Sequence, residues 1–312
     1  MKVRTMRYVA PRSIELYGAK VAPPGNGQVQ VKKKACGLCA ADVYVFAHGP
    51  GSTPWGPPGH EAVGVITEVG PGVTQWKKGD KVAGGGFAEV ENLDASWLIK
   101  LPDDVSDFAL WVAEPVACVV NGLDQAAVRA GERVALVGAG FMGLLLVEGL
   151  MRSPCGELVV MDVDERRLEV ARVFGVKHAV NLSAPQGQNQ LQTLDNSIDV
   201  VIDSTGVQAG LDRSTALVRS GGKIVLFGWV HGTATFNGDT WHMKGITIIN
   251  GSPMSSLDMR SCWKRAVVGL KSGLFDLKPL VTHRGSLEDL PQILAAGADK
   301  TGGYIKGVVC YD

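Results

Sequence analysis

The chain has 312 residues, of which 46% are hydrophobic, and its 31 basic residues are balanced by 31 acidic ones. This length favours two domains over one, and a net charge of zero argues against nucleic acid or an anionic membrane as a partner. We therefore expect a small-molecule partner. Charges in the first residues argue against a secretory signal, so the six cysteines predict reduced thiols in a cytoplasmic protein.

Residues 1–118 carry short strand-like segments between loops rich in proline and glycine. Apolar and polar residues alternate in the first of these segments, as they do in a half-buried strand. The expected strands are Val29–Lys32, Glu61–Gly70 and the segment that follows the turn at Lys78–Val82. This pattern predicts a mainly β domain.

Four side chains in this region suit a divalent metal ion, namely Cys39, His60, Glu61 and Glu114. Zinc binds sulfur, imidazole and carboxylate ligands, and a catalytic zinc site leaves one position open. Neighbouring side chains of an extended chain point in opposite directions, so His60 and Glu61 can both be ligands only if the chain turns at Gly59. Glu61 and Glu114 thus compete for the carboxylate role. The alternative is a buried cysteine, a hydrogen-bonded histidine and two surface glutamates.

Strands and helices alternate over residues 119–262, which predicts parallel βαβ units with helices on both faces of the sheet. The apolar run from Val134 to Met151 is broken by glycines and Glu148, so a buried strand and helix explain it better than a membrane span. The expected helices are Leu144–Met151 and Glu165–Phe174. The expected strands are Arg133–Val137, Glu157–Asp162, Ile198–Asp203 and Lys223–Gly228.

The loop after the first of these strands fits the pattern G-x-G-x-x-G of dinucleotide-binding proteins and leads into a helix. It consists of Gly138, Ala139, Gly140, Phe141, Met142 and Gly143. Asp162 ends the next strand, where an acid binds the ribose hydroxyls, so the pattern favours NAD over NADP. Arg166 or Arg167 could partly offset that preference.

Two further positions at strand ends are candidate cofactor contacts, Thr205 after the third strand and Gly228 at the end of the fourth. Ligands of such sheets bind at the carboxyl ends of the strands, although an ordinary turn would also explain Thr205. The tail from about Lys278 returns to short β and helix signals, with Leu287–Ala296 as an expected helix.

In order and spacing these motifs resemble the zinc-containing medium-chain dehydrogenase/reductases, especially their sorbitol (polyol) dehydrogenase branch. The resemblance implies an α/β protein with a doubly wound Rossmann domain at 119–262 and a GroES-like catalytic domain from 1–118 and 263–312. It also implies hydride transfer between NAD(H) and a secondary alcohol or ketone, and a homodimer or homotetramer. The matching segments are Cys36–Cys39 with Asp42, Gly59–Glu61 with Gly64, Lys78–Val82, Glu114–Pro115, Gly138–Gly143 and Val281–Arg284.

For the metal site, the resemblance implies that Cys39, and not Cys36, is a zinc ligand with His60 and a glutamate. Many relatives have a second cysteine ligand at the position of Glu114. A glutamate there, as in this chain, is typical of polyol dehydrogenases. Glu61 would bind the metal in turn when water or substrate leaves. Many relatives also carry a four-cysteine lobe with a second zinc. Here Val82 leads almost directly to the segment Gly85–Ala88, so we expect one zinc ion per chain.

Other departures from the family concern the substrate. Ala41 and Tyr44 stand where relatives carry Ser or Thr and His for proton relay, so Tyr44 or water would take the proton. Ile248 stands where sorbitol dehydrogenases carry an arginine that touches substrate, which argues against sorbitol itself. Two other functions remain open at this point: a zinc-free quinone or enoyl reductase of the same fold, and a redox-silent NAD-binding regulator.

Overall fold

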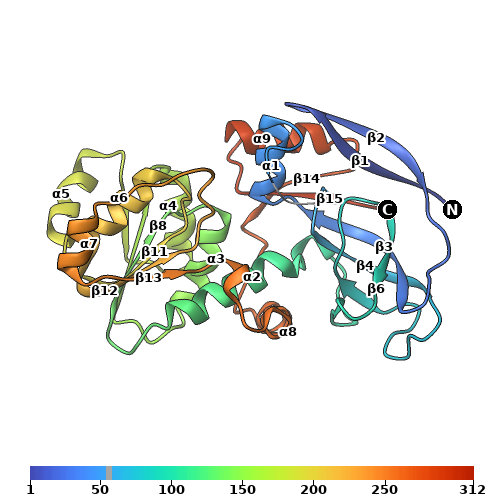
Figure 1. Ribbon diagram of the computed structural model, residues 1–312, viewed down its shortest axis with the longest axis horizontal. Coiled ribbons are helices and arrows are strands. Elements are labelled where there is room, and N and C mark those ends of the chain that lie inside the picture. The colour runs from blue at the N-terminus through green and yellow to red at the C-terminus, as the bar shows by residue number, and fades with distance from the viewer. Residues whose placement is uncertain (54–57) are drawn as a thin grey trace. The chain divides into compact units, whose positions relative to one another are not determined.

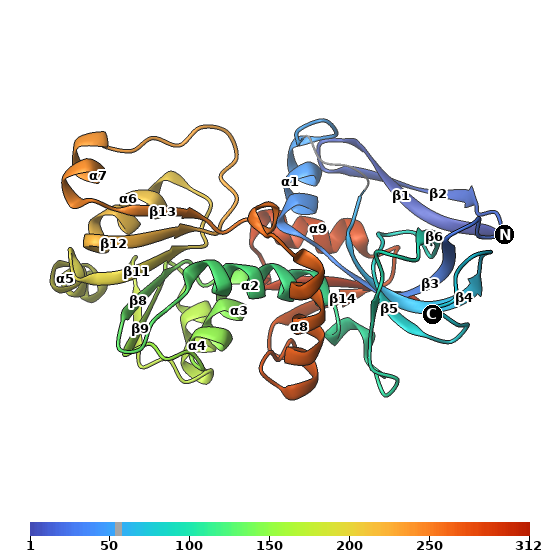
Figure 2. The same cartoon turned by 60° about the horizontal axis from the view of Figure 1, so that its bottom comes forward.

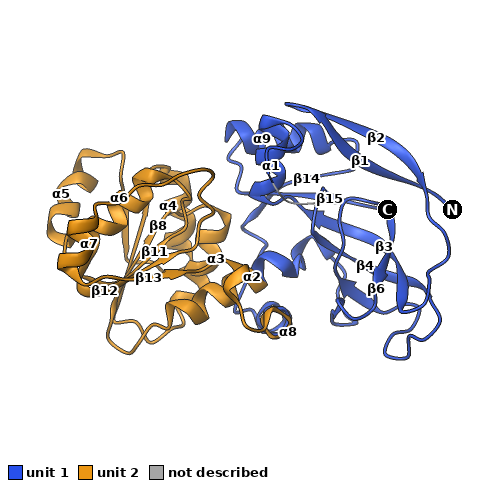
Figure 3. Ribbon diagram, in the orientation of Figure 1, with its two compact units in different colours: residues 1–116, 263–312 blue, residues 117–262 orange. Residues whose placement is uncertain are grey.

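The computed structural model describes residues 1–53 and 58–312 (Figure 1). The chain divides into two compact units, unit 1 with residues 1–116 and 263–312, and unit 2 with residues 117–262 (Figure 3). The sequence placed the divisions after residues 118 and 262. Helices α2 (Ala113–Ala126) and α8 (Met259–Ser272) run across the two divisions. Among the described residues, no helix is both long and apolar enough to span a bilayer.

The sheet of unit 1 is built around one long strand, β3, which pairs antiparallel with β15, β4 and β6. Among the described residues its main strand order is β14-β15-β3-β4-β5-β7. Strands β14 and β15 come from the C-terminal tail, so both ends of the chain build this sheet, as expected. The strands are β3 (Gln28–Gly37), β4 (Glu61–Val69), β5 (Lys81–Ala83), β6 (Val90–Asp94), β7 (Ile99–Lys100), β14 (Val281–Gly285) and β15 (Lys306–Cys310).

Two helices of unit 1, α1 (Ala40–His48) and α9 (Leu290–Asp299), lie side by side (Figure 2). Both contribute to one apolar cluster with β3 and β15. Helix α9 begins three residues later than expected, because Pro291 has no N–H group and its fixed φ suits the first helical turn. The sequence did not predict the hairpin of β1 (Lys2–Ala10) and β2 (Ser13–Lys20). A short 3-10 helix, η1, covers Phe108–Leu110.

Unit 2 has a parallel sheet with the order β10-β9-β8-β11-β12-β13. This confirms the doubly wound fold predicted from the alternating strands and helices. The strands are β8 (Arg133–Val137), β9 (Glu157–Asp162), β10 (His178–Asn181), β11 (Ile198–Asp203), β12 (Val218–Leu226) and β13 (Thr247–Asn250). The helices are α3 (Phe141–Leu150), α4 (Glu165–Val173), α5 (Pro185–Leu194), α6 (Gln208–Leu217), α7 (Gly238–Lys244) and the 3-10 turn η2 (Pro253–Ser255).

The direction of chain winding in unit 2 reverses between β8 and β11, which lie next to each other in the sheet. From β8 the chain proceeds to β9 and β10 on one side, and then returns to β11, β12 and β13 on the other. At such a reversal the loops after the two strands diverge and leave a crevice at the carboxyl end of the sheet, where ligands of these folds bind.

Candidate metal and dinucleotide sites

Three potential metal ligands converge in unit 1. One donor atom from each of Cys39, His60 and Glu61 can be chosen so that all three lie within 4.8 Å of one another. Cys39 is the N-cap residue of α1, and Glu61 is the first residue of β4. Since Glu61 pairs with Gly37 across the β3–β4 ladder, the strand register brings it beside the segment that leads to Cys39.

Gly59 provides the turn that the sequence required for His60 and Glu61 to contribute together. Its φ is 79°, a left-handed conformation that glycine adopts without strain. A side chain there would also collide with the ring of Phe87. After this turn His60 is exposed, whereas Glu61 is buried with only 2% of its surface exposed.

Glu61 forms an ion pair with Lys306, a residue that sequence analysis did not identify. The Lys306 Nζ lies 2.5 Å from the Glu61 Oε2 and donates a hydrogen bond to the Leu38 carbonyl oxygen at 2.9 Å. Burial acts to lower the pKa of Lys306, but Glu61, Cys39 and Tyr304 together outweigh it, so that the pKa is raised. A Cβ at Gly37 would collide with the Glu61 Oε2, so the absence of a side chain there makes room for the pair. A lysine at the start of an apolar C-terminal strand was the signal in the sequence.

Asp42 connects the two ligand-bearing segments. Its Oδ2 accepts the Cys39 N–H at 2.9 Å, and its Oδ1 accepts the Gly59 N–H at 3.0 Å. The side chain is 5% exposed, and burial is the main cause that raises its pKa. Asp42 therefore holds the start of α1 against the turn that precedes His60.

The electrostatics of the cluster fit a cation. Burial raises the pKa of Cys39, and the nearby carboxylates of Glu61 and Asp42 raise it further. A divalent ion would favour the thiolate and offset the repulsion among these groups. Sulfur, imidazole and carboxylate are donors that zinc accepts, and three of them leave a fourth position for water or substrate. The residues present thus fit a catalytic zinc site.

Glu114 and Tyr44 lie outside this group of three. Glu114 is the second residue of α2 and is half-buried, and its charge contributes to the raised pKa of Cys39. The resemblance gave Glu114 the carboxylate role, whereas the geometry groups Glu61 with Cys39 and His60. The Tyr44 ring stacks on the His48 ring at a centroid distance of 4.1 Å, and its relay role stays a prediction.

In unit 2 the three glycines of the nucleotide loop (Gly138–Gly143) occupy three different environments. Gly138 has a φ of 96°, and a Cβ there would lie 2.9 Å from the Ser204 Oγ. A Cβ at Gly140 would meet nothing nearer than the Arg167 Nη1 at 3.9 Å, so its backbone is open to a ligand. A Cβ at Gly143 would collide with the Gly138 carbonyl oxygen. These are the turn, ligand-approach and helix-packing roles of the dinucleotide motif.

The helix after this loop, α3, begins at Phe141, three residues before the expected start, with Gly140 as N-cap. Phe141 and Met142 therefore lie in the first helical turn, whose N–H groups and dipole favour a phosphate. Phe141 is buried and Met142 half-buried.

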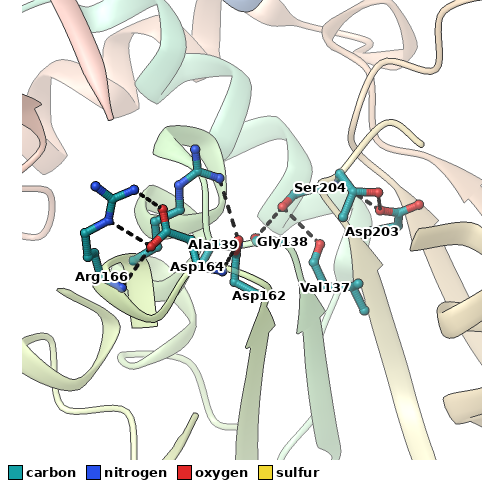
Figure 4. A network of polar contacts seen from close by, with 10 residues as sticks. Val137, Gly138, Ala139, Asp162, Asp164, Arg166, Asp203 and Ser204 are labelled. Carbon is teal, nitrogen blue, oxygen red and sulfur yellow. Dashed lines mark hydrogen bonds and ion pairs between the residues drawn. The ribbon is translucent and has the colours of Figure 1, made fainter. Parts of the chain in front are cut away.

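Asp162 lies at the tip of β9 against the nucleotide loop (Figure 4). Its Oδ2 accepts the Ala139 N–H at 2.6 Å, and its Oδ1 accepts the Asp164 N–H at 2.8 Å. The Arg167 Nη1 is 3.9 Å from the Asp162 Oδ2, whereas Arg166 is paired with Asp164 at 2.8 Å. Of the two arginines, Arg167 is thus the one beside the expected ribose acid.

The loop after β11 lies on the other side of the strand-order reversal. The Ser204 Oγ donates to the Gly138 carbonyl oxygen at 2.6 Å, which ties the two loops together (Figure 4). Thr205 donates its hydroxyl to Asp203 at 2.6 Å. A Cβ at Gly228 would collide with the Gly206 nitrogen, so Gly228 allows the loops after β11 and β12 to approach each other.

Ile248 lies in β13 and packs against the apolar core of unit 2. The correspondence of Ile248 to the substrate-touching arginine of sorbitol dehydrogenases stays a prediction.

Comparisons with known proteins agree with this architecture. Residues 25–103 match the family described as alcohol dehydrogenase GroES-like domain, and residues 141–271 match the family described as zinc-binding dehydrogenase. A sorbitol dehydrogenase from Gallus gallus is 27% identical, with 88% of this chain and 87% of the relative covered. A zinc-type alcohol dehydrogenase-like protein from Escherichia coli strain K12 is 25% identical, with 96% of each chain covered.

A solved structure has the same fold over its whole length. It is an oxidoreductase/dehydrogenase of unknown specificity from Escherichia coli, with a TM-score of 0.89, 24% identity and 100% of both chains covered. The two family matches cover segments of both units, and Cys39, His60 and Glu61 lie within the segment that matches the GroES-like domain. The chain belongs to the medium-chain dehydrogenase/reductase superfamily, which includes the alcohol dehydrogenases.

Proposed function

We propose that this protein is a zinc-dependent dehydrogenase that transfers a hydride between NAD(H) and a secondary alcohol or its ketone, with a polyol, cyclitol or sugar alcohol as substrate. The observation that carries the proposal is the convergence of a thiol, an imidazole and a carboxylate in unit 1, in a chain whose unit 2 has a dinucleotide loop. The resemblance to a sorbitol dehydrogenase supports the polyol class.

Cys39, His60 and Glu61 would hold the metal, which when bound acts as a Lewis acid and lowers the pKa of an alcohol hydroxyl. Lys306 and Gly37 orient the Glu61 carboxylate, and Asp42 keeps the Cys39 segment beside Gly59. Glu114 would act as an alternative carboxylate from α2. Tyr44, or water, would accept the alcohol proton, since a phenolic oxygen can accept one hydrogen bond while its O–H donates another.

The nucleotide loop would hold the pyrophosphate of NAD at Gly140 and the first turn of α3. Asp162 would bind the ribose hydroxyls and disfavour the 2′-phosphate of NADP. Its two oxygens already accept N–H groups from Ala139 and Asp164, which fixes the carboxylate against the loop. Thr205 and Gly228 lie on the other side of the strand-order reversal between β8 and β11, as candidate contacts. The homodimer or homotetramer implied by the resemblance stays a prediction.

The test combines metal analysis of the purified protein with a panel of polyols and secondary alcohols, assayed with NAD and with NADP. The proposal predicts one zinc per chain and reduction of NAD with at least one polyol. A metal-free protein that reduces quinones or enoyl substrates would be a reductase of the zinc-free type. A protein that binds zinc and NADH but oxidises no alcohol would be a redox-silent regulator.

A further inference from the structure

Lys33 is a buried lysine of unit 1 that lies outside the group of converging ligands. It lies in the middle of β3, and its side chain is 0% exposed. Its Nζ donates to the Gly84 carbonyl oxygen at 2.9 Å and lies 3.2 Å from the Glu91 Oε2. A buried ammonium group is costly unless it is paired and hydrogen-bonded, and burial does lower the pKa of Lys33. A lysine at this position therefore calls for an explanation beyond packing.

Lys33 and Glu91 both bind one short loop, Gly84–Phe87, which follows β5 and leads to β6. Lys33 binds the Gly84 carbonyl, and the Glu91 Oε2 accepts the Gly86 N–H at 3.2 Å. Gly85 lies between these two contacts with a φ of 92°, and a Cβ there would collide with the Lys33 Nζ. The Lys33–Glu91 pair thus occupies the space where a side chain of this loop would otherwise lie.

The opposite side of the Gly84–Phe87 loop packs on the segment that carries His60 and Glu61. The Gly84 N–H donates to the Ala62 carbonyl oxygen at 2.8 Å, and the Ala62 N–H donates to the Gly85 carbonyl oxygen at 3.2 Å. A Cβ at Gly86 would lie 2.9 Å from the Gly59 carbonyl oxygen, and the Phe87 ring fills the space beside Gly59. The loop therefore borders the segment both before His60 and after Glu61.

We propose that Lys33, with Glu91, is a positioning residue for the metal site: it holds the Gly84–Phe87 loop, and the loop holds the turn that directs His60 and Glu61 toward Cys39. This inference rests on the zinc site of the proposed function. Asp42 and Lys306 contact the ligand-bearing segments directly. Lys33 and Glu91 would support the same segments indirectly, through the loop. Groups that orient metal ligands typically change metal affinity by about 10- to 100-fold when they are removed.

The structure offers a matched pair of variants. Lys33→Met keeps an unbranched side chain in the buried position and removes the donor to Gly84, while Glu91, whose side chain is 37% exposed, can be solvated. Removal of one partner of a buried ion pair is strongly destabilising when the other charge stays buried, and the partial exposure of Glu91 limits that cost here. Lys32→Met is the control, since Lys32 is the neighbouring residue of β3 and is exposed. Glu91→Ala is a second variant that removes the acceptor of the Gly86 N–H if Lys33→Met does not fold.

Two measurements on the full chain test the inference. Cobalt titration, followed by the visible absorption of the bound ion, should show affinity at least about tenfold weaker and an altered spectrum in Lys33→Met or Glu91→Ala, but not in Lys32→Met. Hydrogen exchange of the metal-free proteins should show faster exchange of the Gly84 and Ala62 amides in the same variants. Equal cobalt affinity in wild type and Lys33→Met overturns the inference. Wild type that binds no cobalt overturns the proposed function, and unchanged exchange then refutes the role of Lys33 in holding the loop.

Discussion

The two units form their candidate sites in different ways. Unit 2 uses one contiguous loop, Gly138–Gly143, and an acid at the tip of the next strand. Unit 1 brings its ligands from the start of α1 and the start of β4, with support from β15 at the far end of the chain. A contiguous site depends on local backbone conformation, whereas a dispersed site depends on strand register and packing. The first therefore tolerates changes elsewhere in the unit better than the second.

The largest expected effect comes from removal of a ligand in unit 1. Cys39→Ala or His60→Ala should abolish zinc binding and lower turnover by more than about 10²-fold, because a Lewis acid contributes several kcal/mol to such a reaction. Metal analysis and steady-state kinetics measure both. Cys36→Ala is the control, since the Cys36 thiol lies in the apolar cluster of unit 1. Turnover that survives in a zinc-free Cys39→Ala protein would contradict the proposed function.

Substitution of two glycines of the same loop should separate ligand binding from folding in unit 2. Gly143→Ala places a Cβ against the Gly138 carbonyl oxygen and should destabilise the protein by roughly 1–3 kcal/mol, the usual cost of overpacking. Gly140→Ala meets no such obstacle and should weaken NAD binding by about tenfold, or ~1.4 kcal/mol, at nearly unchanged stability. Thermal unfolding and fluorescence titration with NADH distinguish these effects. Equal affinity in Gly140→Ala would show that the pyrophosphate lies elsewhere.

Zinc binding in unit 1 should also be sensitive to substitution of a residue that is not itself a ligand. Gly37→Ala places a Cβ where the Glu61 Oε2 lies, so it should displace that carboxylate and weaken zinc binding by about 10- to 100-fold. Competition with a zinc chelator measures the affinity. Gly18→Ala is the control, because a Cβ there has nothing within 4 Å. If Gly37→Ala keeps full affinity, Glu61 is not a ligand and Glu114 becomes the candidate.

Asp162→Ala should reduce the preference for NAD over NADP in unit 2. Loss of the carboxylate removes hydrogen bonds to the ribose and repulsion of a 2′-phosphate, so the ratio of the kcat/KM values should fall by about tenfold, ~1.4 kcal/mol. Arg167 remains beside the vacated position. Wild type that already prefers NADP would refute this assignment.

The smallest expected effect is a pH dependence of stability in unit 1. Burial favours the neutral carboxyl of Asp80, but Lys100 at 2.6 Å and the Lys77 N–H outweigh it and lower the pKa of Asp80. A depressed pKa stabilises the folded state above the unfolded pKa near 3.9, and this contribution is lost as the pH falls through the folded value. Asp80→Asn should therefore cost about 1 kcal/mol at pH 7 and progressively less below pH ~4. A constant difference in chemical denaturation from pH 7 to 2 would contradict this.

What the sequence predicted follows the same division between local and dispersed features. The nucleotide loop, Asp162 and the parallel sheet depend on short-range patterns, and the structure confirms the doubly wound fold. The competition between Glu61 and Glu114 could not be decided, because it depends on which strands become neighbours. Lys306 and Lys33 were missed for the same reason, since each acts on a segment far away in the sequence. For Lys306 the signal was a lysine at the start of an apolar strand. Lys33 lies between Lys32 and Lys34 in β3, so the sequence carried no comparable signal for it.

The central claim is that one thiolate, one imidazole and one carboxylate hold a single zinc ion in unit 1. X-ray absorption at the zinc edge of the loaded protein tests it most directly, because sulfur ligands lie at about 2.3 Å from zinc and nitrogen or oxygen ligands at about 2.0–2.2 Å. The account predicts one sulfur and two or three lighter ligands in wild type, and loss of the sulfur shell in Cys39→Ser. A wild-type spectrum with two or more sulfurs, or with none, would contradict it.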